Sequence, residues 1–147
     1  MMKLNPYLNF DGQCEEAFNF YKKVFKTEFN QFGMMRFGDI PPQEGMPPIA
    51  DDVKNRVMHV AINIGNEVLM GSDTMPGFGN GPFKIGDNSY ISIHPDSREE
   101  ADRLFNELSE GGQVEMPMED QFWGDYYGSL RDRFGTSWMI NFNAGNV

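Results

Sequence analysis

Two segments of the chain repeat apolar residues at the spacing of an amphipathic helix. In residues 13–26 the apolar positions follow the intervals i, i+3, i+4, i+7, i+10 and i+11, with acidic residues near the start and lysines near the end. The same spacing recurs in residues 97–110, where Asp96 or Ser97 is a candidate N-cap and Gly111-Gly112 a candidate stop. The pattern therefore predicts two helices of similar length.

Other segments have the apolar and polar alternation of half-buried strands. The clearest are residues 3–10, 57–64, 67–72, 89–94 and 138–142, and weaker patterns cover residues 28–37, 113–116 and 125–131. Gly65-Asn66 joins two of the clear strands and is a two-residue hairpin signal. The chain therefore predicts a protein with more strands than helices.

The elements recur in the same order in the two halves of the chain. Each half has a strand, a helix and then three strands. We therefore expect one α+β domain over residues 1–147, in which two βαβββ modules, at about residues 1–74 and 88–147, form one curved mixed sheet around a cleft. The Gly-rich residues 75–88 are the expected linker, and the Pro-rich, acidic residues 38–54 are either a lid or a dimer arm.

The acidic charge of the chain narrows the classes of partner. Lys and Arg number 12 against 22 Asp and Glu, a net charge of −10, which argues against binding nucleic acid or an anionic membrane. One Cys excludes an intramolecular disulfide. The first ten residues lack the pattern of a secretory signal, and no apolar run has the length of a membrane helix, so we expect a cytoplasmic protein.

Three longer segments carry a family resemblance. They are PYLNFDGQCEEAFNFYKKVF at residues 6–25, HVAINIGNEVLMGSD at residues 59–73 and FWGDYYGSLRDRFGTSWMINF at residues 122–142. They resemble the vicinal oxygen chelate superfamily, which includes glyoxalase I, extradiol dioxygenases and bleomycin-resistance proteins, and within it the PhnB-like branch with its demethylubiquinone methyltransferase-like label. The resemblance implies a glyoxalase/bleomycin resistance-like fold and a homodimer. No glycine-rich loop after a strand is present to hold S-adenosylmethionine, so the residues give the methyltransferase label little weight.

The resemblance also implies where a metal would bind. Enzymes of the superfamily hold a divalent metal with His, Gln and Glu residues on the first and last strands of the two modules. The corresponding positions here are Met70, Met139 and residues near 5–7 and 89–90, and all depart from that ligand pattern. Amide, phenol and thioether groups hold hard divalent ions poorly. We therefore expect no cofactor, with a divalent metal in a rearranged site around His59 as the alternative.

The strand face expected to line the cleft is uncharged and rich in hydrogen-bonding groups, which suits a small molecule with some apolar area. His59 is the candidate catalytic base, but a hydrogen bond to a neighbouring strand is an equal explanation of it, and for His94 the better one. The predicted ligand-binding residues are Tyr7, Asn9, His59, Asn63, Tyr90, Ser92, Trp123, Tyr127, Met139 and Asn141.

Several other residues have two interpretations. The aromatic residues of segment 122–127 form either a wall that stacks on a ligand or a core and dimer contact. Cys14 lies on the apolar stripe, so we expect burial rather than activation by the helix N-terminus. Asp132 is expected to cap a turn. The eleven Met residues predict adaptable packing rather than a soft-metal site. The GFGNG segment precedes Pro82, not a helix, and is therefore not a phosphate loop.

Three functions remain open at this point. The first is metal-free binding of a small molecule. The second is an enzyme of lyase, isomerase or dioxygenase type, with a rearranged metal site or with His59 as base. The third is an interaction protein whose cleft is vestigial, favoured by the Pro-rich, acidic loop and the net charge. A fold constrains architecture better than activity, so the residues of the site must decide among them.

Overall fold

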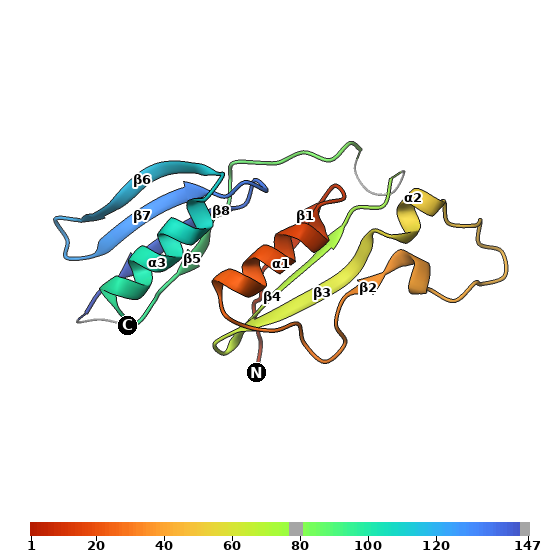
Figure 1. Ribbon diagram of the computed structural model, residues 1–147, viewed down its shortest axis with the longest axis horizontal. Helices are drawn as coiled ribbons and strands as arrows, with labels where there is room; N and C mark the ends of the chain where they lie inside the picture. The colour runs from red at the N-terminus through yellow and green to blue at the C-terminus, as the bar shows by residue number, and fades with distance from the viewer. Residues whose placement is uncertain (77–80, 145–147) are drawn as a thin grey trace. The chain divides into compact units, whose positions relative to one another are not determined.

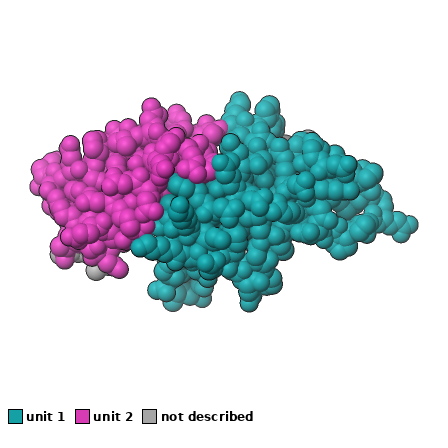
Figure 2. All heavy atoms as spheres, viewed as in Figure 1, with its two compact units in different colours: residues 1–84 teal, residues 85–147 magenta. Residues whose placement is uncertain are grey.

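The computed structural model describes residues 1–76 and 81–144 of the chain. The chain divides into two compact units, Met1–Lys84 and Ile85–Val147 (Figure 2). Residues 77–80 belong to the GFGNG segment of the expected linker and lie outside the described residues. Each unit is therefore described by itself.

The first unit contains one four-stranded mixed sheet. Its order is β1-β4-β3-β2, with β1 parallel to β4 and the other pairs antiparallel. Helix α1 packs on β3 and β4 and lies across one face of this sheet (Figure 1). The elements are β1 (Tyr7–Phe10), α1 (Cys14–Val24), β2 (Met35–Arg36), the 3-10 turn η1 (Phe37–Asp39), α2 (Asp51–Lys54), β3 (Val57–Ile64) and β4 (Glu67–Asp73).

The second unit repeats this plan. Its order is β5-β8-β7-β6, again with the first and last strands of the unit parallel, and α3 packs on β7 and β8 (Figure 1). The α+β class and the two βαβββ modules are thus confirmed. The single curved sheet expected from the sequence is instead two four-stranded sheets, one in each unit. The elements are β5 (Ile91–Ile93), α3 (Arg98–Ser109), β6 (Gln113–Asp120), β7 (Tyr126–Arg131) and β8 (Ser137–Phe142).

Helix α1 forms where the apolar stripe predicts it, and it buries one continuous stripe of side chains. Lys26 adopts the left-handed conformation, with φ of 53°. Its N–H donates to Lys23 O at 3.3 Å, and the N–H of Thr27 donates to Lys22 O at 3.0 Å. This is a Schellman ending, which stops the helix at Val24, two residues before the predicted end. The buried residues are Cys14, Ala17, Phe18, Tyr21 and Val24.

Helix α3 confirms the predicted capping. Ser97 is the N-cap, and its Oγ accepts the N–H of Glu100 at 3.1 Å. The helix ends at Ser109, ahead of Gly111, whose φ is 74°. Its buried side chains, like those of α1, come from a single stripe facing the sheet.

A glycine in each sheet lets the covering helix approach the strands closely. A Cβ atom at Gly71 of β4 would lie 2.5 Å from the ring of Phe18, and one at Gly128 of β7 would lie 2.9 Å from the ring of Phe105. Each aromatic ring therefore rests directly on strand backbone. The same contact fixes which face of each sheet is turned toward its helix.

The first unit has less strand than the sequence predicts. β1 begins at Tyr7 because the side chain of Asn5, not its backbone, accepts the N–H of Val68, at 3.3 Å. In segment 28–37 only β2 forms, together with one isolated bridge between Phe29 and Ile62. The segment 38–54, expected to be irregular, contains α2 and the end of η1.

Strand β6 is longer than predicted and extends past Pro117 to Asp120. Proline removes a ladder donor, which is tolerated at a sheet edge or a bulge. β6 is an edge strand, and its pairing shifts register between Val114 and Met116 and again between Met116 and Glu119. The irregular pairing accommodates Pro117, which directly follows the end of the predicted strand.

Arg36 forms hydrogen bonds at both ends of the loop between β2 and β3. Its backbone N–H donates to Asp39 Oδ2 at 2.9 Å, and its guanidinium donates to Asn55 O at 2.8 Å. The same guanidinium pairs with both carboxylate oxygens of Glu15 on α1, at 3.1 and 2.8 Å. This pairing lowers the pKa of Glu15, because the hydrogen bonds from Arg36 stabilise the charged carboxylate.

The carboxylate of Asp73, at the end of β4, is buried and joins three parts of the first unit. Its Oδ1 accepts the N–H of Gly12 at 2.9 Å and that of Cys14 at 3.0 Å. Its Oδ2 accepts the N–H of Val57 at 2.9 Å. Asp73 therefore caps the start of α1 although it lies on β4. In α3 the corresponding cap is Ser97, the residue directly before the helix.

None of the helices within residues 1–76 and 81–144 has both the length and the apolar character that a bilayer crossing needs.

Replacing Asp73 with Ala should destabilise the protein strongly. The substitution leaves three backbone N–H groups without their charged acceptor, so we expect a loss of roughly 3 kcal/mol in the free energy of unfolding in urea. Glu16→Ala, an exposed change in the first turn of the same helix, should stay within about 0.5 kcal/mol of wild type. Equal losses for the two variants would contradict the tethering role of Asp73.

Cys14 should resist thiol reagents until the protein unfolds. The side chain is fully buried, and burial together with the charges of Asp73 and Glu15 raises the pKa of the thiol. With an aromatic disulfide reagent at pH 8, the native protein should release almost no chromophore, and the protein in urea should release one equivalent. A stoichiometric reaction of the native protein at the rate of free cysteine would disprove this.

Candidate functional site

The sheet face opposite α1 is identified by the contact of Gly71 with Phe18. Since Gly71 is turned toward the helix, its neighbours Met70 and Ser72 on β4 point to the opposite side. The register places Tyr7 and Ala61 beside Met70, and Met35 beside His59. We call this surface the first distal face. It includes Tyr7, Asn9, Met35, His59, Ala61, Asn63, Met70 and Ser72.

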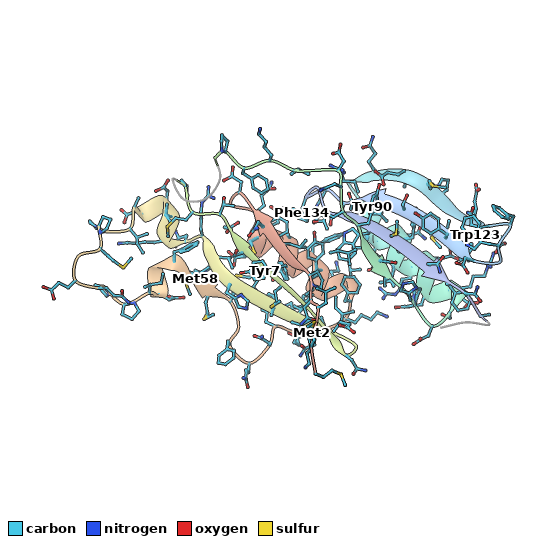
Figure 3. All side chains as sticks on the ribbon, turned by 180° about the vertical axis from the view of Figure 1, so that it is seen from behind. Met2, Tyr7, Met58, Tyr90, Trp123 and Phe134 are labelled. Carbon is cyan, nitrogen blue, oxygen red and sulfur yellow. The ribbon has the colours of Figure 1, made fainter. Side chains whose placement is uncertain are left out.

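Tyr7 and His59 contact each other on the first distal face. The Tyr7 hydroxyl lies 3.3 Å from His59 Nδ1, and the ring centroids are 5.8 Å apart. Tyr7 on β1 therefore reaches across β4 to β3, and the residue is 45% exposed. Tyr7 is labelled in Figure 3. A phenol and an imidazole in contact can exchange a proton with each other or present one donor and one acceptor to a ligand.

The remaining predicted residues of this face are polar and exposed. Asn9 accepts a hydrogen bond from the Ser72 hydroxyl at 3.2 Å. Asn63 is exposed near the hairpin, paired in register with Val68. The sequence thus correctly places Tyr7, Asn9, His59 and Asn63 on one face, with uncharged side chains only.

The second sheet has a corresponding face opposite α3. Gly128 is turned toward the helix, so Tyr127 and Ser129 point to the other side. In register, Met139 lies between Ser129 and Ser92, and Asn141 lies beside Tyr127. We call this surface the second distal face. Its predicted ligand-binding residues are Ser92, Tyr127, Met139 and Asn141.

Tyr90, just before β5, is linked to the opposite edge of the second sheet. Its hydroxyl donates to Glu115 Oε1 on β6 at 2.9 Å. This bond and the nearby negative charge raise the pKa of Tyr90, so the phenol stays protonated at neutral pH. Glu115 was not predicted as a site residue, and the link depends on a bulge in β6 that no periodicity reveals.

His94 follows β5 and contacts the Ser92 hydroxyl through Nε2 at 3.2 Å. This is the hydrogen bond to a neighbouring residue that the sequence analysis expects for it. Nearby, Asp125 accepts hydrogen bonds from Asn143 and, at 3.0 Å, from Trp123 Nε1. These bonds lower the pKa of Asp125, led by that of Asn143.

The aromatic residues before β7 do not form one cluster. Tyr126 and Tyr127 alternate along the strand, so Tyr126 points toward α3, where its hydroxyl lies 2.5 Å from Asp102 Oδ1. Phe122 and Trp123 lie in the turn between β6 and β7, with ring centroids 4.9 Å apart and exposed fractions of 98% and 55%. The single cluster predicted at this strand start is therefore wrong, because strand alternation separates its members, and Trp123 belongs to the turn rather than to a strand of the second distal face (Figure 3).

Two charged residues near β8 have structural roles. Asp132 is buried and accepts the backbone N–H groups of Phe134 and Thr136 and the indole N–H of Trp138, at 2.9, 3.0 and 2.9 Å. It therefore holds the turn before β8, as the sequence indicates. Arg131 pairs with Asp87 at 3.7 Å, a surface ion pair.

Imidazole, thiol and carboxylate side chains do not gather in groups of three in the described parts of the chain. Among residues 1–76 and 81–144, no three His, Cys, Asp or Glu side chains are close enough to share an ion. Asp73, an acidic residue near the strands of His59, is turned toward α1 and bound to backbone N–H groups. The side chains around His59 therefore do not fit a hard divalent metal, which prefers carboxylate and carbonyl oxygen as ligands.

Comparison with known proteins gives the relationships of the chain. Protein YjdN of Escherichia coli K12 is 31% identical over 149 residues, covering 95% of each chain. The crystal structure of PA1353 from Pseudomonas aeruginosa is 38% identical with a TM-score of 0.83, covering 97% of this chain and 98% of that one.

More distant structures share the fold. A glyoxalase/bleomycin resistance protein/dioxygenase family enzyme from Burkholderia phytofirmans is 16% identical with a TM-score of 0.56, covering 92% of this chain and 95% of its own. The glyoxalase/bleomycin resistance-like fold implied by the signature segments is therefore confirmed. The model of the family described as 3-demethylubiquinone-9 3-methyltransferase matches residues 2–141, so the chain belongs to this family.

Proposed function

We propose that this protein binds a small organic molecule on its first distal face without a divalent metal. The observation that carries the proposal is the contact of Tyr7 with His59 on an uncharged, partly exposed face. Both groups offer hydrogen bonds, and the neighbouring thioether of Met70 offers apolar area. A small ligand with a flat apolar part and one or two polar groups suits such a surface.

The second distal face supports the same class of ligand. It carries amide, hydroxyl, phenol and thioether groups, from Asn141, Ser92, Tyr127 and Met139. Its nearby acidic residues Glu115 and Asp125 already accept hydrogen bonds within the unit. The exposed Glu119, paired in register with Tyr127, adds a carboxylate to this face. The surface therefore offers both uncharged and acidic groups to a ligand.

An enzyme is the second candidate, and the same contact favours it. When the Nδ1–H of His59 donates to the Tyr7 oxygen, the imidazole is fixed in the tautomer whose Nε2 lone pair is free to accept a proton. His59 would then act as general base on a ligand bound beside it. Among residues 1–76 and 81–144, no three His, Cys, Asp or Glu side chains lie close enough together to hold a divalent metal beside this base.

His59→Ala should weaken small-molecule binding. Thermal-shift screening of small aromatic and amphipathic compounds on the wild-type protein would identify a ligand, whose affinity is then measured by calorimetry. Loss of one hydrogen-bonding side chain should reduce affinity by roughly tenfold. The exposed Asn66, in the hairpin turn, gives the control Asn66→Ala, which should bind like wild type.

The outcomes of this experiment separate the candidate functions. Turnover of the identified compound by wild type and its loss in His59→Ala, with binding retained, would establish the enzyme. Binding that is equal in His59→Ala and Asn66→Ala, with no turnover of the compound by wild type, would overturn the assignment of the ligand to the first distal face. Elemental analysis showing a stoichiometric divalent metal in the purified protein would overturn the metal-free proposal.

We also propose that the protein is a homodimer of the cytoplasm. The edge strand β6 and the following turn support a dimer, because they expose the apolar side chains of Val114, Met116 and Phe122. The location is supported by the single Cys14, which is free and buried, as suits a reducing compartment.

Light scattering after size exclusion at micromolar concentration should give the mass of two chains. Phe122→Ser should shift the wild-type dimer toward monomer, because it removes an almost fully exposed aromatic anchor. Phe32→Ser is the matched control, since Phe32 is also exposed, at 66%, but lies in the loop before β2. A wild-type monomer would contradict the homodimer, and equal effects of the two variants would contradict the role of the turn.

A further inference from the structure

The first distal face places soft donor atoms on both sides of His59. Met35 on β2 is paired with His59 on β3, next to a register shift between Met35 and Arg36. Met70 on β4 is paired with Ala61, two residues along β3 from His59, and is therefore its diagonal neighbour. Because residues paired across neighbouring strands point to the same side of a sheet, both thioethers share the face of the imidazole.

These positions are close enough for the three side chains to meet. Directly opposed residues have Cβ atoms about 5 Å apart and diagonal ones about 7–8 Å apart, within reach of long side chains. Methionine is unbranched and adapts its sulfur position through three rotatable bonds. Both methionines and His59 are only partly buried, so an ion has access from solvent.

Tyr7 prepares the imidazole for a ligand role. In the tautomer in which Nδ1–H donates to the Tyr7 oxygen, across 3.3 Å, the lone pair of Nε2 is free. A ligating histidine commonly has its second nitrogen fixed by a hydrogen bond in this way. Tyr7 therefore serves as a positioning residue for His59.

The donor set selects the ion. Two thioethers and one neutral imidazole are soft or borderline ligands and carry no charge, which disfavours Zn²⁺, Mn²⁺ and other ions that prefer anionic or oxygen ligands. Thioether sulfur is a preferred ligand of Cu(I). From this juxtaposition we propose that Met35, His59 and Met70 form a binding site for a soft monovalent cation, Cu(I).

The site does not depend on the organic ligand of the proposed function. Binding is simple coordination, with no change in the oxidation state of copper. Neutral imidazole and thioether ligands release no proton on binding, whereas a thiol ligand such as Cys14 would release one. Cys14 is also fully buried, and it is present in every variant considered below.

The test is anaerobic competition for Cu(I) between the protein and the chromophoric chelator bicinchoninate. Wild type should withdraw one Cu(I) per chain without releasing a proton at pH 7.5. Met35→Leu and Met70→Leu should each weaken Cu(I) binding by at least about tenfold, since each removes one of three ligands. Tyr7→Phe should weaken it by roughly tenfold through the orientation of His59.

The matched control is Met46→Leu. Met46 is 51% exposed in the loop between η1 and α2, outside the strands of the site. Leucine conserves the volume of methionine, so all these variants should fold, which urea denaturation would verify. Met46→Leu should bind Cu(I) like wild type.

Failure to withdraw Cu(I) from the chelator would overturn the site. Weakening that is equal in Met35→Leu, Met70→Leu and Met46→Leu would overturn it as well, as would release of one proton per Cu(I). The organic ligand found by thermal shift provides the independent readout. If it binds while Cu(I) does not, only the copper site fails, and if Cu(I) binds while no organic ligand does, only the proposed function fails.

Discussion

The first unit depends on one buried carboxylate. Asp73 ends β4 beside Phe10 of β1, and it accepts N–H groups from the turn before α1, from the first residue of α1 and from the start of β3. This fixes the helix on one face of the sheet while β1, β4 and β3 keep their order. Asp73 therefore holds these strands from the side of the sheet that faces α1, whereas Tyr7 and His59 meet on the other side.

Local periodicity explains what could be predicted from the sequence. A strand alternates with a period of two, so His59 and Asn63 were correctly assigned to one side, and the Gly65-Asn66 hairpin fixed how β3 meets β4. Helix caps at Ser97 and Gly111 are equally local signals. The face of each strand that bears the candidate site was predictable for this reason.

Pairing between distant strands was not predictable in the same way. The contact of Tyr7 with His59 joins residues 52 positions apart and follows from the parallel pairing of β1 with β4, which no local pattern encodes. Met35 lies in a weak strand of two residues, so its pairing with His59 was not visible in the sequence. The sequence predicts only a packing role for these methionines, because their position beside a histidine follows from strand pairing.

The anchoring of the β2–β3 connection has a consequence for how the family can vary. Arg36 lies just before the loop, and its side chain binds Asn55, just after the loop, and Glu15 on α1. The base of the loop is therefore closed without any contribution from residues 40–50. Closing a loop of twice the length costs only about 0.6 kcal/mol more. Insertions and deletions in residues 40–50 are therefore nearly neutral for the sheet, and this segment can diverge among descendants of one ancestor while the strands that bear His59 stay the same.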